Sequence, residues 1–231
     1  MTAERYPSLV PDEPILIEAL RSATRTLHVE LERGPLVREL LRGELPRPAY
    51  GAMLRNLLAI YQALERGLSQ HAQRPTLAWL PLRALRRVEA LEVDLGVWHG
   101  PGWAEELPVH PLTQDYQKRL DRLSQHDPDL LLAHAYVRYL GDLSGGQSLQ
   151  RLVARQMGTT TAEGTRFYQF GTGDEVRSLA GELRAGLGRD HWPRAQVEAL
   201  AEEASWSFRQ HALIFGALAK EHGLSSPTSA L

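Results

Sequence analysis

Apolar residues recur at three- and four-residue spacing in nearly every long segment of the chain, whereas alternating β-branched runs are missing from the sequence. The first apolar stripe consists of Leu16, Leu20, Ala23, Leu27 and Leu31. Asp12 and Pro14 before it are typical of a helix start, and Gly34-Pro35 after it is typical of a helix end. The pattern predicts an all-α protein whose first amphipathic helix lies between these signals.

The same periodicity predicts the remaining helices. Their expected ranges are 48–73, about 81–95, 112–123, 127–157, 176–187 and 193–222. Glycines are expected to interrupt the helices at 96–102 and at 171–173. No linker rich in Pro, Gly and Ser divides the sequence, and no internal repeat is visible. We therefore expect one domain over residues 1–231, made of about eight helices, with an ordered core over about 12–222 and a flexible tail at 224–231.

Composition narrows the possible functions. The 231 residues include 26 basic and 28 acidic side chains, so no global field draws the chain to nucleic acid or to an anionic membrane. The absence of cysteine excludes disulfides, thiol catalysis, Cys-ligated zinc, iron–sulfur clusters and thiolate-ligated metal centres. The N-terminal segment has acids and prolines where a secretory signal needs an apolar run, and no window of 18 apolar residues follows. A soluble, cytoplasmic protein is expected.

The helix predicted over 127–157 contains Gly141, Gly145 and Gly146 in its interior. Each interior glycine costs about 0.8–1 kcal/mol relative to alanine, so some contact must offset about 3 kcal/mol. Close helix–helix packing or an interhelical loop is the ordinary explanation. A phosphate cradle is disfavoured, because no strand precedes and no Gly-Lys-Ser or Gly-Lys-Thr follows. The third explanation is a flat, bulky ligand on the helix backbone, where a Cβ at Gly141 or Gly145 would collide with it.

Polar residues near these glycines could indicate what kind of ligand binds there. Asp142 lies one turn after Arg138, so the two can form an i,i+4 ion pair; an exposed surface pair is the ordinary alternative. Tyr61 lies on the apolar face of the helix predicted over 48–73, where a core tyrosine with a satisfied hydroxyl is the ordinary expectation.

His28 is a candidate metal ligand. It shares a helix face with Leu20, Thr24 and Leu31, where a histidine is more often a satisfied core residue. Arg21 lies seven residues earlier on the same stripe, a rise of about 10 Å. That rise fits an iron at the centre of a macrocycle and a carboxylate at its edge, bound by imidazole and guanidinium respectively.

Other catalytic arrangements lack their sequence motifs. No two histidines are three or four residues apart, so the HExxH zinc motif is absent. No acidic residue precedes a histidine by three positions, which disfavours a di-iron carboxylate bundle. The G-x-S-x-G motif of hydrolytic nucleophiles is also absent.

The segment Ala133–Gln147, AHAYVRYLGDLSGGQ, resembles the distal-helix signature of the α-helical haem (heme) oxygenases almost letter for letter. The segments Ala23–His28, Ile60–Glu65 and Trp98–Pro101 are similar to other segments of that family. The resemblance extends over roughly residues 14 to 222. It favours the explanation that a flat ligand lies on the glycines.

This resemblance implies a single-domain helical bundle with haem between a proximal helix and a kinked, glycine-rich distal helix. It implies that His28 is the axial iron ligand and that the bend containing Gly141, Gly145 and Gly146 covers the opposite haem face. On this basis we expect all three glycines to be buried.

The resemblance also implies roles for polar residues. Asp142 would anchor water on the distal side, with Arg138 and Tyr61 in the same hydrogen-bond network. The positions that match the family's propionate-binding residues are Arg21, Tyr136 and Arg184. The sequence departs from the pattern at Ala180, where a second basic residue is often found, and at His211, where asparagine is common. The first departure affects propionate anchoring, and the second can alter distal water.

The implied reaction is oxidative cleavage of haem to biliverdin, CO and ferrous iron, with haem as both substrate and oxygen-activating cofactor. The sequence has no flavin or nicotinamide fingerprint, so O₂ would be reduced with electrons from a partner such as a ferredoxin or a flavoprotein reductase. A monomer without nucleic-acid or membrane partners is expected. Two alternatives stay open. A haem carrier or sensor would need His28 but not Asp142, and a purely structural bundle would leave the three glycines unexplained.

Overall fold

The computed structural model describes residues 15–160, 163–189 and 192–224, and every regular element in these ranges is a helix. The α-helices, in chain order, are α1 (Leu16–Arg33), α2 (Pro35–Arg42), α3 (Arg47–Gln70), α4 (Leu82–Leu85), α5 (Val88–Trp98), α6 (Trp103–Glu106), α7 (Pro111–His126), α8 (Leu131–Ala135), α9 (Gly141–Met157), α10 (Gly173–Leu187) and α11 (Arg194–Glu221). The shorter segments are η1 (Pro128–Leu130), the π-helical η2 (Tyr136–Leu140) and η3 (Arg166–Tyr168). The predicted all-α class is confirmed.

The boundary between α1 and α2 shows that a helix stop can also be a helix start. α1 ends at Arg33, as Gly34-Pro35 predicts, and Gly34 leaves the helical conformation with φ −60° and ψ 145°. Pro35 then occupies the first position of α2, where its missing N–H has no intrahelical acceptor to lose. The periodicity alone does not predict α2, which is only eight residues long.

The two predicted interruptions are present but shorter than expected, because α5 extends to Trp98 and α10 begins at Gly173. α5 runs through Gly96, which is exposed and has open space around it, and ends at Trp98. α10 begins at Gly173 rather than at Val176, because Thr172 caps it: its hydroxyl accepts from the Glu175 N–H, and the Glu175 carboxylate accepts from the Thr172 N–H. The expected count of about eight helices was too low for the described ranges, since α2, α4 and α6 are short.

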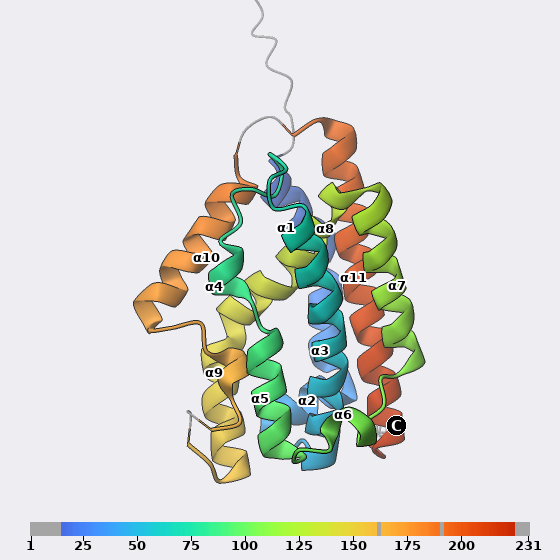
Figure 1. Ribbon diagram of the computed structural model, residues 1–231, viewed down its shortest axis with the longest axis vertical. Coiled ribbons are helices and arrows are strands. Elements are labelled where there is room, and N and C mark those ends of the chain that lie inside the picture. The colour runs from blue at the N-terminus through green and yellow to red at the C-terminus, as the bar shows by residue number, and fades with distance from the viewer. Residues whose placement is uncertain (1–14, 161–162, 190–191, 225–231) are drawn as a thin grey trace, which may run out of the picture.

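Helix α3 lies in the middle of the molecule, with α5 along one side and α7 along the other (Figure 1). The longest helix, α11, packs along α1 over much of its length. Most side chains of α3 are buried, which explains why its apolar residues are not confined to a single stripe.

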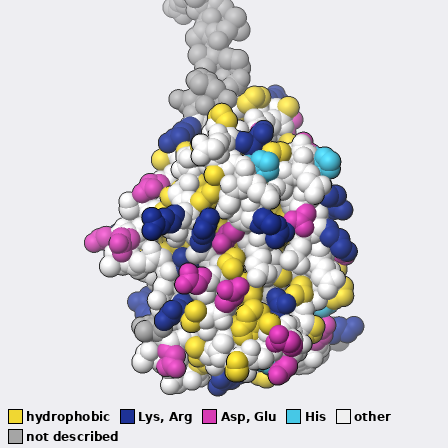
Figure 2. Space-filling model, in the orientation of Figure 1, with side chains coloured by type: hydrophobic (Ala, Val, Ile, Leu, Met, Phe, Trp, Pro, Cys, Tyr) yellow, Lys and Arg dark blue, Asp and Glu magenta, His cyan; other side chains and the backbone are white. Residues whose placement is uncertain are grey.

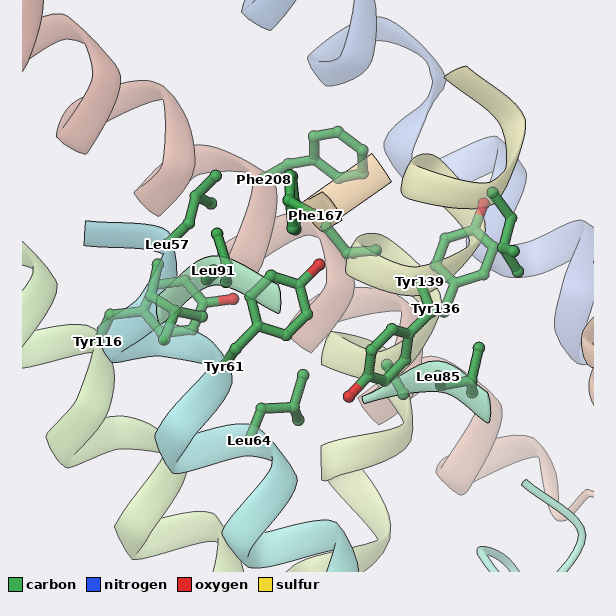
Figure 3. Close-up of a cluster of buried hydrophobic side chains, with 14 of the residues drawn as sticks. Leu57, Tyr61, Leu64, Leu85, Leu91, Tyr116, Tyr136, Tyr139, Phe167 and Phe208 are labelled. Atoms are coloured by element: carbon green, nitrogen blue, oxygen red, sulfur yellow. The ribbon is translucent and has the colours of Figure 1, made fainter. Parts of the chain in front are cut away.

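Figure 3 shows how the core fixes the ring of Tyr61, from the middle of α3. The ring packs edge-on against Phe167 of η3 at 5.8 Å between centroids, and tilted against Tyr139 of η2 at 5.7 Å. Burying one large apolar side chain contributes about 1.5–3 kcal/mol. These contacts hold α3, η2 and η3 together and set the position of the Tyr61 hydroxyl.

The glycine-rich motif does not interrupt its helix. The chain passes from α8 through η2 into α9 without leaving helical geometry, and Gly145 and Gly146 lie inside α9. The bend visible between α8 and α9 (Figure 1) coincides with the π-helical segment that ends one residue before Gly141. A π-turn is a recognised cause of helix kinks. The alternative of an interhelical loop at the glycines is therefore excluded, and the kinked helix that the resemblance implies is present.

The predicted ends of the ordered core lie at the limits of the described residues. The proposed start at Asp12 and Pro14 falls outside them, as does the predicted tail beyond Leu224. Leu224 itself donates a backbone hydrogen bond of 2.8 Å to the carbonyl of Ala219.

Figure 2 shows basic and acidic side chains intermixed on the face that carries α4 and α5, in line with the near balance of charge. None of the described helices is long and apolar enough to cross a bilayer.

Candidate haem site between α1 and α9

Two adjoining cavities lie between α1 and α9, with volumes of about 310 and 580 Å³. His28 of α1 and Gly141 and Gly145 of α9 line both of them. Apolar side chains from α2, α3 and α11 complete the inner cavity, among them Leu40, Met53, Leu57, Phe208 and Phe215. Small-molecule sites in proteins typically enclose about 300–1,000 Å³ behind mostly apolar walls with a few polar groups. The two cavities of this cleft have volumes and a mostly apolar lining that match such sites.

His28 is not a satisfied core histidine. Its side chain is 53% exposed, and Nδ1 lies 3.6 Å from the carboxylate of Glu32, one turn later. Its ring packs edge-on against Phe208 of α11 at 5.8 Å. A carboxylate beside one ring nitrogen is the usual means of orienting a metal-binding histidine. Nε2 is then the nitrogen available to a metal in the cavity.

The three glycines of the motif differ in their surroundings. Gly146 is buried, and a Cβ there would make contacts of ordinary van der Waals length with Tyr168, 3.5 Å from its carbonyl oxygen, so this glycine packs against the protein. Gly141 is exposed and Gly145 half-buried, and a Cβ on either would meet no described protein atom within 4 Å. The expectation that all three are buried was wrong. Packing within the protein does not require glycine at 141 or 145, and because both residues line the cleft, a ligand can lie against the α9 backbone there.

Asp142 is the centre of a compact polar cluster. The hydroxyl of Tyr61 donates to its Oδ2, and Nη2 of Arg138 donates to its Oδ1 at 2.9 Å. Nε of Arg138 also donates to the Tyr61 hydroxyl at 3.2 Å. The side chains of Arg138 and Asp142 are only 13% and 9% exposed, so the surface ion pair is excluded. The structure brings together the three residues that the resemblance grouped.

The electrostatics of this cluster favour a carboxyl group that can hold a proton. Burial raises the pKa of Asp142, while the charge of Arg138 and the hydrogen bond from Tyr61 oppose that rise. Burial also raises the pKa of Tyr61 well above its ordinary value, so its hydroxyl keeps its proton and donates. Burial acts to lower the pKa of Arg138, but the charge of Asp142 and the interactions with Tyr61 together outweigh it, and the pKa is raised. An acid with a raised pKa at the wall of a cavity is a candidate for proton transfer.

The outer cavity carries groups suited to carboxylates. Arg21 of α1 is exposed and lines it, as does Tyr136, whose hydroxyl lies 3.4 Å from Oγ1 of Thr24. Arg25 also lines this cavity and is exposed, although sequence reasoning did not single it out. The sequence could have indicated Arg25 as a further carboxylate-binding residue, because it lies one turn after Arg21 and three residues before His28.

Arg184 and Ala180, the two α10 positions singled out in the sequence, do not line either cavity. Arg184 is exposed and is not among the residues that line either cavity, so its role stays a prediction. Ala180 is buried, so a basic side chain there would need a partner in the interior.

His211 of α11 lies at the wall of the inner cavity together with Arg138 and Asp142. Its ring is buried and packs edge-on against Tyr116 at 5.2 Å and Phe215 at 6.0 Å. This position is close enough to the polar cluster for Arg138 to influence its pKa.

Comparison with known proteins identifies the family. The family model described as heme oxygenase matches residues 15–217. The chain is 35% identical over 219 residues to heme oxygenase 1 of Rattus norvegicus, covering 92% of this chain and 76% of the relative. It is 30% identical over 200 residues to heme oxygenase 1 of a Nostoc species, covering 87% and 84%. The crystal structure of heme oxygenase-2 from a Synechocystis species with heme and NO superposes with a TM-score of 0.85 at 30% identity, covering 91% of each chain. The chain belongs to the haem oxygenase family.

Proposed function

We propose that this chain binds haem in the cleft between α1 and α9 and cleaves it oxidatively to biliverdin, CO and ferrous iron. Haem degradation is the activity of the family to which the chain belongs. The observation that carries the assignment of the site is the cleft that His28 of α1 and Gly141 and Gly145 of α9 line together, with Asp142 at the wall of its inner cavity. A Cβ on either glycine would project into the space that a ligand beside the α9 backbone would occupy.

Residues on α1 would hold the substrate. His28 would bind the iron through Nε2, with Glu32 orienting its ring. Arg21 and Arg25, together with Tyr136, would pair with the propionate carboxylates at the open edge. Bound haem supplies the iron that activates O₂ and is itself the molecule that is cleaved.

Asp142 would hold and release the protons that the reaction consumes. Its carboxylate is fixed by Tyr61 and Arg138, so it cannot swing away from the cavity. A positioned carboxyl acting through water contributes about 10²–10⁴-fold as a general acid. The backbone at Gly141 and Gly145 leaves space for a ligand to lie close to this carboxyl group, which supports selectivity for one haem edge.

Electrons would come from a separate protein. The sequence contains no nucleotide-binding fingerprint, so a ferredoxin or a flavoprotein reductase is the proposed donor. We also propose that the protein acts as a monomer in the cytoplasm, where its cysteine-free composition presents no difficulty.

The test is a turnover assay with purified protein, haemin, a reductant and catalase in air, followed by visible spectroscopy. Loss of the haem band with growth of a red-absorbing bilin supports the proposal. A stable haem complex that never turns over, even with a second reductase, would support the alternative of a haem carrier or sensor.

A further inference from the structure

The short turn η3 forms part of the wall of the inner cavity. It is three residues long, and two of them, Phe167 and Tyr168, line that cavity. The Phe167 ring packs edge-on against Tyr61, with 5.8 Å between the ring centroids (Figure 3). A single turn of 3₁₀-helix has too few hydrogen bonds to hold its own geometry. The position of this wall therefore depends on what binds the η3 backbone.

Two side chains of opposite charge bind that backbone, and both come from α5 and its N-terminal boundary. The carboxylate of Asp94 accepts from the backbone N–H of Arg166 at 2.9 Å and from that of Phe167 at 2.8 Å. Arg87 lies at the N-cap position of α5, and its Nη1 donates to the carbonyl oxygens of Phe167 at 3.3 Å and of Gln169 at 2.6 Å. The N–H and the C=O of Phe167 are thus both held by charged side chains.

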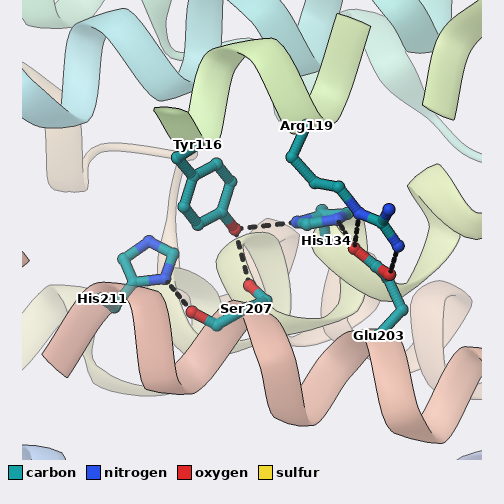
Figure 4. A network of polar contacts seen from close by, with 6 residues as sticks. All are labelled: Tyr116, Arg119, His134, Glu203, Ser207 and His211. Atoms are coloured by element: carbon teal, nitrogen blue, oxygen red, sulfur yellow. Dashed lines mark hydrogen bonds and ion pairs between the residues drawn. The ribbon is translucent and has the colours of Figure 1, made fainter. Parts of the chain in front are cut away.

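Arg87 is a buried cation without a carboxylate partner. Its residue surface is only 8% exposed, and it forms no ion pair with any described residue. Its Nε donates to the carbonyl oxygen of Leu85 at 3.1 Å, and its guanidinium lies 3.8 Å from the centroid of the Phe170 ring. By contrast, Arg119 of α7 binds both carboxylate oxygens of Glu203, at 3.1 and 2.5 Å (Figure 4). Removing a guanidinium from water is costly, so the backbone carbonyls and the Phe170 ring are what compensate for the burial of Arg87.

The charge of Arg87 also acts on the polar cluster at the cavity. Together with the charge of Arg138, it opposes the rise that burial causes in the pKa of Asp142. Arg87 itself lines neither cavity of the cleft. Any influence of this side chain on a bound ligand must therefore pass through other residues.

We propose that Arg87 is a positioning residue that fixes η3 against α3 by holding two backbone carbonyl oxygens. Through this hold, the Phe167 ring keeps the Tyr61 hydroxyl on the carboxylate of Asp142. The effect on haem cleavage rests on the proposed function, whereas the effect on the protein without haem does not.

Three variants separate this anchoring from packing and from general stability. Arg87→Met keeps a long unbranched side chain but cannot donate to the carbonyls, whereas Arg87→Lys keeps both the charge and a donor. Arg55→Met is the matched control. Arg55 of α3 also donates to a backbone carbonyl, that of Leu107 at 3.1 Å, and also lies over an aromatic ring, that of Trp103 at 5.5 Å, but it lines neither cavity. Thermal unfolding followed by circular dichroism checks that each variant is folded.

The first readout is amide hydrogen exchange in the protein without haem, resolved by NMR. We expect the Phe167 amide to exchange about tenfold faster or more in Arg87→Met, because a charge-assisted hydrogen bond to a buried carbonyl is lost. Arg87→Lys and Arg55→Met should leave its rate within about threefold of that in the unaltered chain. Equal rates in Arg87→Met and Arg55→Met would overturn the proposal.

The second readout is the hydroxyl proton of Tyr61, again without haem. A hydroxyl held on a buried carboxylate gives a downfield proton signal that exchanges slowly with water, and the absence of this signal in Tyr61→Phe identifies it. We expect its exchange to be about tenfold faster or more in Arg87→Met and to return toward the original rate in Arg87→Lys. An unchanged rate in folded Arg87→Met would overturn the proposal, because η3 would then not position Tyr61.

A measurement on the unaltered chain keeps the test independent of folding in the variants. The Phe167 amide should exchange about a hundredfold more slowly or more than an open peptide, and a freely exchanging η3 would overturn the proposal. Because these readouts use protein without haem, an unaltered chain that fails to turn over would contradict the proposed function without deciding this question. In a chain that turns over, Arg87→Met should lower kcat by about tenfold and leave the KM for haem within about threefold. An unchanged kcat would contradict the link from Arg87 to Asp142.

Discussion

The hydroxyl of Tyr61, in the middle of α3, donates a hydrogen bond to the carboxylate of Asp142, in the first turn of α9. The two residues are 81 positions apart in the chain, and the ring of Tyr61 is fully buried. Arg138 completes the cluster by donating to both. The cluster anchors the functional carboxyl group to the core of the bundle rather than to α9 alone. Its rigidity is what a positioned proton donor requires.

Replacing Asp142 by alanine should leave haem bound and stop its conversion to biliverdin. Binding is retained because His28 and the arginines of α1 are untouched, whereas the loss of a positioned acid costs about 10²–10⁴-fold in rate. The measurements are a haem titration and the bilin yield in the turnover assay. Asp115→Ala, at an exposed surface pair on α7, is the matched control and should turn over normally. A normal bilin yield from Asp142→Ala would refute the proton-transfer role.

Replacing His28 by alanine should abolish the native spectra of the ferric and ferrous-CO complexes, because the ring nitrogen that binds iron is gone. His126→Ala, at the exposed end of α7, serves as the control and should leave the spectra unchanged. Native spectra in the His28 variant would mean that another of the nine histidines is the ligand.

Gly145→Ala should separate stability from haem binding. A Cβ at Gly145 meets no described atom within 4 Å, so the protein without haem should gain about 0.5–1 kcal/mol in free energy of unfolding from the better helix former. Gly181→Ala, at an exposed interior position of α10 that is equally open, should gain a similar amount. Only the Gly145 variant should bind haem more weakly, by about tenfold or more, an effect of about 1.4 kcal/mol. Equal haem affinity in the two variants would show that the ligand does not lie against α9.

In the protein without haem, the buried histidines His134 and His211 should contribute a loss of stability as the pH falls below about 6.5. Burial lowers the pKa values of His134 and His211, the latter to about 3, so the unfolded chain binds more protons than the folded chain below the ordinary histidine pKa of 6.5. Each histidine then contributes a slope of up to about 1.4 kcal/mol per pH unit. Above about pH 5.5 the carboxylate of Glu203, whose pKa is lowered to about 2, stays ionised in both states and adds little. Asp94, whose pKa burial raises to about 6, binds a proton in the folded chain and opposes the slope of the histidines.

Urea unfolding of the unaltered chain and of the variant His211→Gln, at a series of pH values between 5.5 and 7, measures the contribution of His211 as the difference between the two slopes. His211→Gln should flatten the slope by removing one of the two histidines. A slope that is the same in the variant would mean that His211 titrates normally in the folded chain.

Much of this architecture could be predicted from the sequence, for identifiable reasons. The long helices follow from apolar periodicity, and the pairing of Arg138 with Asp142 follows from their i,i+4 spacing. Tyr61 joins that pair across tertiary space, so spacing cannot reveal it and only the family resemblance grouped the three. The position of His28 on an apolar stripe suggested a buried ring, but the stripe borders a cleft and the ring is half exposed.

Other features depend on contacts that no local pattern records. The π-helical turn at Tyr136–Leu140 has ordinary helical periodicity, so the bend was assigned to the glycines that follow it. Of those glycines only Gly146 packs against the protein, because Tyr168 happens to lie beside it. The tautomer of His211 likewise depends on the carbonyl of Ser207 and on burial against Tyr116 of α7.

The most direct test of the account is to measure CO and bilin together in a single turnover of the haem-loaded protein with a ferredoxin and its reductase. Oxidative cleavage at one carbon predicts about one CO and one biliverdin for each haem lost, with matching time courses. Loss of the haem band without CO, or CO without a bilin, would contradict the claim that this cleft cleaves haem.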